Sequence, residues 1–451
     1  MSSIDWFSLV IFVIALSLMI FLHEFGHFLV SRFFKIEVEE FGFGLPPRAM
    51  GLWRGAGYLL VGGKRVEIPR NFDRGFDWAR LVNKPVTLTA DPVNGANVLR
   101  TVEVGELTGA YSPSTSLRLG VQAGSLKMDG IVNEVHPGTL LSLNWLPIGG
   151  FVRPKGENDP RVAGGLAAAS PWKRIAVLMA GPVMNLLTAM IVFGIVTGMQ
   201  GIAIAGPVNL EEIAPNSPAS EAGLQVNDKI LQVNAQPVED TTTLSDTIRQ
   251  NLDKPISLLI ERDGQQMTVT ITPLSSRSPS EGAVGIVMAP ATRPATIVEI
   301  VRNGAVMTGL QAAGLIYLPV ALIQGAIQPS EARLVGLKGI FDMVNAAVQK
   351  DVTTRQTDTS QPGAATPSHP TNWTLYIMGM LSVSLGVINL FPIPALDGGR
   401  ILFTLPEILF HRRVPPEVEN MVNGVAMLLL IAFMVLINVM DFVNPAQPFI
   451  P

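Results

Sequence analysis

The sequence predicts an α-helical integral membrane protein with about four core transmembrane helices, a β-rich cytoplasmic insertion and a separate small α+β domain. Three observations support this fold class. The 451 residues are 48% hydrophobic and only 15% charged, whereas ordinary globular domains carry about 25% charged residues. Apolar stretches of membrane-spanning length recur along the chain. The polar stretches between them contain short alternating runs and turn residues, as β-structure does.

Charge and cysteine content exclude several functional classes. The net charge of −4 at pH 7 offers no basic surface for nucleic acid, so no nucleic-acid partner is expected. The chain contains no cysteine, which excludes disulfides, thiol catalysis and cysteine-ligated zinc. Any zinc site must therefore use histidine and carboxylate ligands.

Residues 1–36 form the first predicted span, and the motif at 23–27 reads HEFGH. Residues i and i+4 share one face of a helix, so His23 and His27 can bind one ion, and Glu24 beside them suits a general base. The alternative is a chance match on a core helix. Because polar groups inside a span are costly unless they serve a site, the motif favours a zinc site.

Flanking charges predict the orientation of this span. Arg32 and Lys35 follow it, so its carboxyl end is expected to face the cytoplasm. The amino end lacks the basic region of a cleaved signal peptide, so the span is expected to be retained. About 13 Å of helix separates His23 from Arg32. The candidate site therefore lies inside the bilayer, near its cytoplasmic surface.

Two β-rich stretches follow the first span. Residues 37–138 are expected to form the cytoplasmic insertion, folded at about 52–138, and its pattern indicates no function. Residues 139–156 are apolar and β-prone around Gly149 and Gly150. They predict a membrane re-entrant β-loop whose open edge can pair with an extended polypeptide; an ordinary buried strand is the alternative.

The second predicted span, residues 172–200, leads into a soluble module. Gly181 and Pro182 allow close helix approach, and Asn185 needs a polar partner in the helix bundle, although simple helix packing is an alternative. The module at 205–275 has the strand, turn and helix pattern of a PDZ domain of the bacterial-protease type, which it resembles. Such a domain can bind an extended peptide by strand addition or serve only as a spacer.

Residues 373–398 form the third predicted span and 420–442 the fourth. The third span ends in NLFPIPALDGGR, where Asp397 follows a helix broken by Pro392 and Pro394. Catalytic zinc usually takes three protein ligands, so Asp397 is the candidate third ligand. An Asp-Gly turn that only ends the helix is the alternative reading of this acid.

The stretch before the third span is harder to assign. Residues 304–328 are uncharged and long enough to cross the bilayer. A crossing there would put Asp397 on the side opposite His23. Residues 296–348 are therefore expected to form an interfacial or re-entrant amphipathic helical segment. Residues 350–372, rich in Thr, Ser, Pro and Gln, predict a flexible linker.

The two motifs together resemble the site-2 protease family of intramembrane zinc metalloproteases, near the bacterial branch that includes the regulator of sigma-E protease. The resemblance covers the four predicted spans, the module at 205–275 and the glycine pair. It implies a Zn²⁺ cofactor. The matching residues are His23, His27 and Asp397 as zinc ligands, Glu24 as catalytic base, Asn389 as a substrate- or oxyanion-stabilising residue, and Gly149, Gly150, Pro392 and Pro394 at the substrate.

This resemblance implies cleavage of single-span membrane proteins, such as anti-sigma factors, within or near their transmembrane segments. The expected location is the inner membrane, with the site toward the cytoplasm and the PDZ domain outside it, where a peptide ligand is possible. Two features depart from the family: the insertion at 52–138, and one PDZ domain where relatives carry two. A catalytically silent membrane PDZ scaffold is the alternative function. A transporter is less favoured, because no internal repeats are found.

Overall fold

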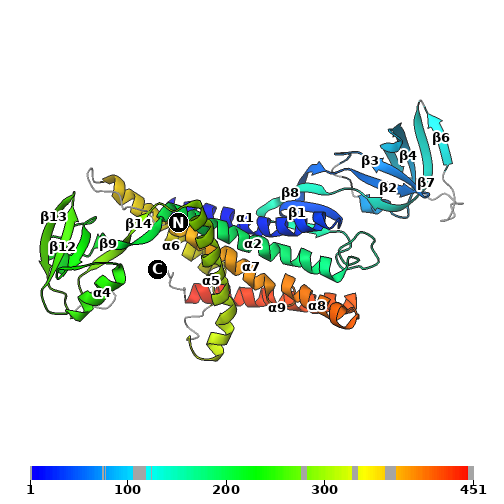
Figure 1. Cartoon of the computed structure of the whole chain (residues 1–451). Helices are drawn as coiled ribbons and strands as arrows, with labels where there is room; N and C mark the ends of the chain where they lie inside the picture. Colours follow the sequence, from blue (N-terminus) through cyan, green and yellow to red (C-terminus); the bar gives the residue numbers. More distant parts are fainter. Residues whose placement is uncertain are drawn as a thin grey trace. The chain divides into compact units, whose positions relative to one another are not determined.

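The structure is a computed structural model that describes most of the chain (Figure 1). The described residues are 3–73, 76, 78–104, 118–122, 124–275, 282–327, 334–360 and 372–444. The chain forms two compact units. The first contains Met1–Thr188, Gln311–Asp342 and Met380–Gln447, and the second contains Ala189–Leu310, Met343–Gly379 and Pro448–Pro451.

Long helices make up most of the described chain outside the sheets. They are α1 (Ser3–Phe33), α2 (Pro171–Gln200), α5 (Ile297–Ile323), α6 (Leu337–Ser360), α7 (Trp373–Leu390), α8 (Asp397–Phe410) and α9 (Pro416–Val443). Within the described residues, α1, α2, α5, α7 and α9 are long and apolar enough to cross a membrane. In α9 only 6% of the apolar window is buried in the protein, so its side chains require lipid around them. The chain is a multi-pass membrane protein.

The number of core spans remains a prediction, because α5 is a fifth candidate by length and composition. The interfacial or re-entrant assignment of residues 296–348 likewise remains a prediction. The predicted linker at 350–372 is wrong for residues 350–360, which continue α6. A helix that has already formed gains a hydrogen bond with each added residue, so it can run on through a polar sequence. Residues 361–371 lie outside the described part.

Small residues bring α1, α2 and α7 together in the first unit. A Cβ atom on Gly26 of α1 would lie 2.4 Å from the Ala180 carbonyl oxygen of α2. A Cβ atom on Gly386 of α7 would lie 3.0 Å from the Pro182 carbonyl oxygen of α2. Any larger side chain would push these backbones apart. Lipid-embedded helices associate through this kind of close packing, and here it places the α2 backbone beside the HEFGH motif.

A pair of long, folded-back strands lies beside α1 (Figure 1). They are β1 (Val38–Arg54) and β8 (Leu140–Pro154), which pair antiparallel. Each doubles back on itself, so that Phe43 pairs with both Leu143 and Gly150. The two strands expose large apolar side chains, among them Met50 and Trp53, and Leu45, Trp145 and Leu146 at the tips. The predicted loop at 139–156 is therefore only half of this sheet, because β1 forms the other half.

Aromatic rings and buried charge fix β1. Phe41 packs within 6.1 Å, between ring centroids, of Phe21, Phe25 and Phe28 on α1. The buried Glu40 carboxylate accepts hydrogen bonds from Arg48 at 2.8 and 2.6 Å. Burial alone would raise the pKa of Glu40, but the hydrogen bonds and positive charge of Arg48 outweigh it and hold the pKa below its ordinary value.

The insertion between β1 and β8 is a compact sheet with its own core. It contains β2 (Gly57–Val61), β3 (Lys64–Ile68), the short helix η1 (Trp78–Leu81), β4 (Pro85–Val93), β5 (Ala96–Val104), β6 (Arg118–Gln122) and β7 (Ser125–His136). The strand order is β2-β3-β5-β4-β7-β6, and an additional β2–β7 pairing closes the sheet on itself. Leu59, Leu88, Met128 and Val132 are fully buried inside it, together with Trp78.

The second unit contains an α+β module. Its elements are β9 (Ile202–Ile213), α3 (Pro218–Glu221), β10 (Lys229–Val233), β11 (Gln236–Pro237), α4 (Thr241–Gln250), β12 (Ile256–Arg262), β13 (Gln265–Ile271) and β14 (Ile286–Arg293). The sheet order is β13-β12-β10-β9-β14, with β11 paired to β10. The predicted boundary at 275 is too early, because β14 completes the sheet by pairing with β9.

Candidate zinc site

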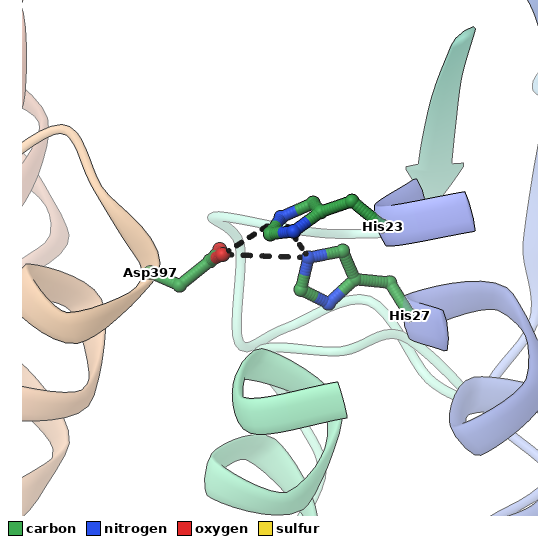
Figure 2. A group of neighbouring side chains, drawn as sticks. All are labelled: His23, His27 and Asp397. Carbon is green, nitrogen blue, oxygen red and sulfur yellow. Dashed lines mark hydrogen bonds and ion pairs between the residues drawn. The ribbon is translucent and has the colours of Figure 1, made fainter. Parts of the chain in front are cut away.

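Two histidines and one aspartate converge in the first unit, and Figure 2 shows their side chains pointing toward one another. The side chains of His23 and His27 project from α1, and Asp397 is the first residue of α8. Asp397 Oδ2 lies 3.1 Å from His23 Nε2 and 3.5 Å from His27 Nε2. The two Nε2 atoms are 3.2 Å apart. The three residues offer ligand atoms that all lie within 4.8 Å of one another. His23 and Asp397 meet here although they are 374 positions apart in the sequence.

The turn between α7 and α8 delivers the carboxylate. The predicted third span at 373–398 is too long, because α7 ends at Leu390 and the chain bends through Pro392 and Pro394 before α8 begins. A Cβ atom on Gly398 would lie 2.2 Å from the Phe391 carbonyl oxygen. Only glycine fits this turn, and the turn places Asp397 at the helix start, where the helix dipole favours a negative charge.

Backbone and side-chain partners hold the two imidazoles. Both rings are buried, with 7% of each residue exposed. His27 Nδ1 lies 2.7 Å from the Val177 carbonyl oxygen on α2. An oxygen there fixes the proton on Nδ1 and leaves the Nε2 lone pair free for a metal. His23 Nδ1 lies 3.1 Å from the side-chain amide of Asn185, also on α2.

Space for an ion comes from Gly181. A Cβ atom at this position would lie 2.3 Å from His27 Nε2 and 2.7 Å from His23 Nε2. The missing side chain therefore leaves room beside both Nε2 atoms. Two imidazole nitrogens and one carboxylate oxygen are also the donor set of many catalytic zinc sites, with a position left for water. These residues fit a zinc ion.

Glu24 lies next to the group and touches the β1–β8 sheet. Its Oε2 accepts a hydrogen bond from the Val152 backbone N–H at 3.0 Å. Among the described residues the 150–154 segment of β8 pairs only with β1, so its other side, which carries this N–H, is a free edge of the sheet. The edge of the sheet and the carboxylate thus meet at one point.

The structure places the other predicted site residues around the group rather than in it. The Asn389 side-chain amide donates to the Leu385 carbonyl oxygen of its own helix at 3.0 Å. A Cβ atom on Gly149 would lie 2.7 Å from the Ile20 side chain, one turn before the histidine motif. A Cβ atom on Gly150 would lie 2.8 Å from the Gly42 carbonyl oxygen. The glycine pair therefore allows β8 to approach both α1 and β1.

Some groups at the site carry no sequence signal as functional residues. The Val177 carbonyl and the Val152 N–H act through the backbone, which any residue supplies. Gly181 and Asn185 do stand out in a membrane span as small and polar residues. Their i, i+4 spacing, the same as that of the two histidines, was the available signal that one face of α2 serves the site.

Comparison with known proteins identifies the family of the chain. The profile of Peptidase family M50 matches residues 11–60 and 118–433, and the unmatched 61–117 falls inside the insertion. A Listeria monocytogenes PDZ domain of known structure matches 20% of this chain and 92% of its own, with 14% identity and a TM-score of 0.17. A Campylobacter jejuni protein named as a candidate zinc metalloprotease is 30% identical over 72% of this chain and 86% of its own. The zinc metalloprotease RasP of Geobacillus kaustophilus is 24% identical over 96% of both chains. The chain belongs to Peptidase family M50.

Proposed function

We propose that this zinc metalloprotease hydrolyses peptide bonds of single-span membrane proteins, within or next to their transmembrane segments, with His23, His27 and Asp397 as the zinc ligands and Glu24 as the general base. Membership of Peptidase family M50 and relatives named as zinc metalloproteases support the zinc-dependent peptidase activity and its intramembrane setting. The observation that carries the residue assignment is the convergence of the three ligand atoms from α1 and α8.

The chemistry divides between the ion and the residues of the chain. A bound zinc ion supplies Lewis-acid polarisation of the scissile carbonyl and makes a water acidic. Glu24, adjacent to the ligands, accepts the proton of the attacking water and passes it to the leaving amine nitrogen. Asn389 sits one turn before the prolines and is the proposed stabilising donor for the oxyanion, which requires it to leave its bond to Leu385.

Substrate must reach this site in an extended form, because a helix hides its carbonyls in its own hydrogen bonds. The β8 edge at Val152 supports this requirement, since an added strand there lies next to Glu24. The exposed apolar tips of β1 and β8 suit a sheet that dips into lipid. We propose that Gly149 and Gly150 shape this edge, that Pro392 and Pro394 flank it, and that the site faces the cytoplasmic side of the inner membrane.

Metal content tests the ligand assignment. Purified wild-type protein should contain about one zinc per chain. The Asp397→Ala and His27→Ala variants should lose most of it, because each removes one of three protein ligands. Elemental analysis gives the stoichiometry, and the exposed acid Glu103, changed to Gln, is the matched control. Retention of full zinc by both ligand variants would refute the assignment, and a wild type without zinc would favour the catalytically silent scaffold.

The substrate class can be tested with the same preparation. Wild-type and Glu24→Gln proteins are incubated with a panel of single-span membrane proteins from one cell. Fragments cut within or next to a span, and formed only by the wild type, identify the substrates. Cleavage confined to soluble loops would contradict the intramembrane site.

We further propose that the α+β module is a PDZ domain that binds an extended peptide, outside the cytoplasm. A cavity of about 350 Å³ lies between α4 and the edge strand β14. Ile248, Arg249 and Leu252 line it from one side, and Ile286 and Met288 line it from the other. An edge strand beside a largely apolar groove is the arrangement used for strand addition.

A charge in this groove should weaken peptide binding. The Leu252→Glu variant should weaken the affinity for fluorescein-labelled peptides with an apolar carboxyl-terminal residue by about tenfold or more, because burying a carboxylate there is costly. Fluorescence anisotropy of the full-length protein measures the affinity. Met267, equally exposed on β13 at the other edge, is the control when changed to Glu. Equal binding by the two variants would rule out the groove.

A further inference from the structure

We propose that Asn185 is a positioning residue for His23, and that its Oδ1 accepts a hydrogen bond from the His23 Nδ1–H when the site holds zinc. The inference rests on the proposed function, because it takes His23 as a zinc ligand through Nε2. It adds a role for a residue of α2 that contributes no ligand itself.

Each histidine requires a hydrogen-bond acceptor for its Nδ1–H, and the two find different partners. The His27 Nδ1–H donates to the Val177 backbone carbonyl at 2.7 Å. That bond commits the proton to Nδ1 and leaves the Nε2 lone pair available to a metal ion. His23 must carry its proton on Nδ1 for the same reason. Its Nδ1 therefore requires an acceptor, and the group 3.1 Å away is the Asn185 side-chain amide.

Of the two ends of the Asn185 amide, only Oδ1 can accept a hydrogen bond from the His23 Nδ1–H. In the structure Nδ2 faces His23 Nδ1 at 3.1 Å. A donor there moves the imidazole proton to Nε2, the atom that faces Asp397, and blocks metal binding. A half rotation of the amide group about the Cβ–Cγ bond exchanges Nδ2 with Oδ1 and presents Oδ1 to the Nδ1–H. No other hydrogen bond opposes that rotation, because Oδ1 is buried and has no partner among the described residues.

The backbone around Asn185 is held in place. The residue is fully buried, and its carbonyl oxygen accepts a hydrogen bond from Ser382 Oγ of α7 at 2.8 Å. A Cβ atom on Gly386 of α7 would lie 3.3 Å from the Asn185 Cβ. Asn185 also lies four residues after Gly181, so the two share the face of α2 that meets the imidazoles. The Asn185 side chain therefore approaches His23 from a backbone that is held in place.

Zinc affinity separates this role from simple packing. Full-length Asn185→Ala, Asn185→Asp and Thr188→Ala variants are purified, and their zinc dissociation constants are measured by chelator competition. Asn185→Ala should bind zinc about 10–100 times more weakly than wild type, which is the usual cost of losing a ligand's hydrogen-bond partner. Asn185→Asp should stay within a few-fold, because a carboxylate only accepts. Thr188, whose hydroxyl bonds its own helix, should have no effect when changed to Ala.

Each outcome decides the assignment. Wild-type zinc affinity in Asn185→Ala would show that the side chain only packs, and would overturn the proposal. Loss of affinity in both Asn185→Ala and Asn185→Asp, with unchanged unfolding midpoints, would make Asn185 a donor and overturn the acceptor role. If Asn185→Ala does not fold, loss of zinc affinity in Asn185→Asp still overturns the acceptor role. If the wild type itself binds no zinc, the proposed function fails first, and the two failures remain distinguishable.

Discussion

The Glu24→Gln variant should bind zinc as the wild type does and cleave its substrates at least about 10²–10⁴ times more slowly. Glutamine keeps the shape of the side chain and an oxygen that can accept from the Val152 N–H, as Glu24 does at 3.0 Å. It cannot take a proton from water at neutral pH. The ligands His23, His27 and Asp397 are untouched. Elemental analysis and the initial rate of substrate cleavage measure the two effects on one preparation.

The control for this variant is another carboxylate-to-amide exchange. Glu103 is exposed on β5 in the insertion sheet, and Glu103→Gln should retain wild-type cleavage. Near-normal cleavage by Glu24→Gln would remove Glu24 from the chemistry. Loss of zinc together with activity would instead mean that Glu24 supports the metal site.

The Gly181→Ala variant should lose zinc and activity together. The added methyl group would lie 2.3 Å from His27 Nε2 and 2.7 Å from His23 Nε2, where a bound ion needs room. Alanine's usual advantage over glycine in a helix interior, about 1 kcal/mol, is reduced here because residue 181 precedes Pro182 inside α2, so the helical content must be checked as well. Zinc content and cleavage rate, read beside the helical circular dichroism signal, test this expectation.

The control for Gly181→Ala is the same substitution at Gly424. Gly424 lies inside α9, and a Cβ atom there meets nothing within 4 Å. Gly424→Ala should keep both zinc and cleavage. A Gly181→Ala protein with one zinc per chain and normal activity would show that the ion does not use this space, and the arrangement of His23, His27 and Asp397 around it would need revision.

Much of the site could be predicted from the sequence, because polar and charged side chains within a membrane span cost free energy unless they serve a site. His23 and His27 interrupt an apolar helix at a spacing that puts them on one face. Asp397 stands at a proline-broken helix end, the sort of place where a carboxylate can turn inward. The structure brings these three side chains together. Their roles remain predictions until metal content and activity are measured.

The rest was hidden for identifiable reasons. The pairing of β1 with β8 joins segments separated by the whole insertion, and no local pattern records such a partner. The Val152 N–H is backbone, so no residue type marks it. The module in the second unit runs to Arg293 because β14 returns to the sheet after a polar stretch. The helical continuation of α6 to Ser360 is supported by its preceding turns rather than by its own composition.

The insertion enters and leaves the sheet at neighbouring points. Arg54 at the end of β1 pairs with Leu140 at the start of β8, and the Gly55 N–H donates to the Thr139 carbonyl at 2.9 Å. A polypeptide whose two ends meet in this way can be acquired, exchanged or deleted without displacing the strands on either side. The size and fold of the insertion can therefore change while the pairing of β1 with β8 beside α1 stays the same.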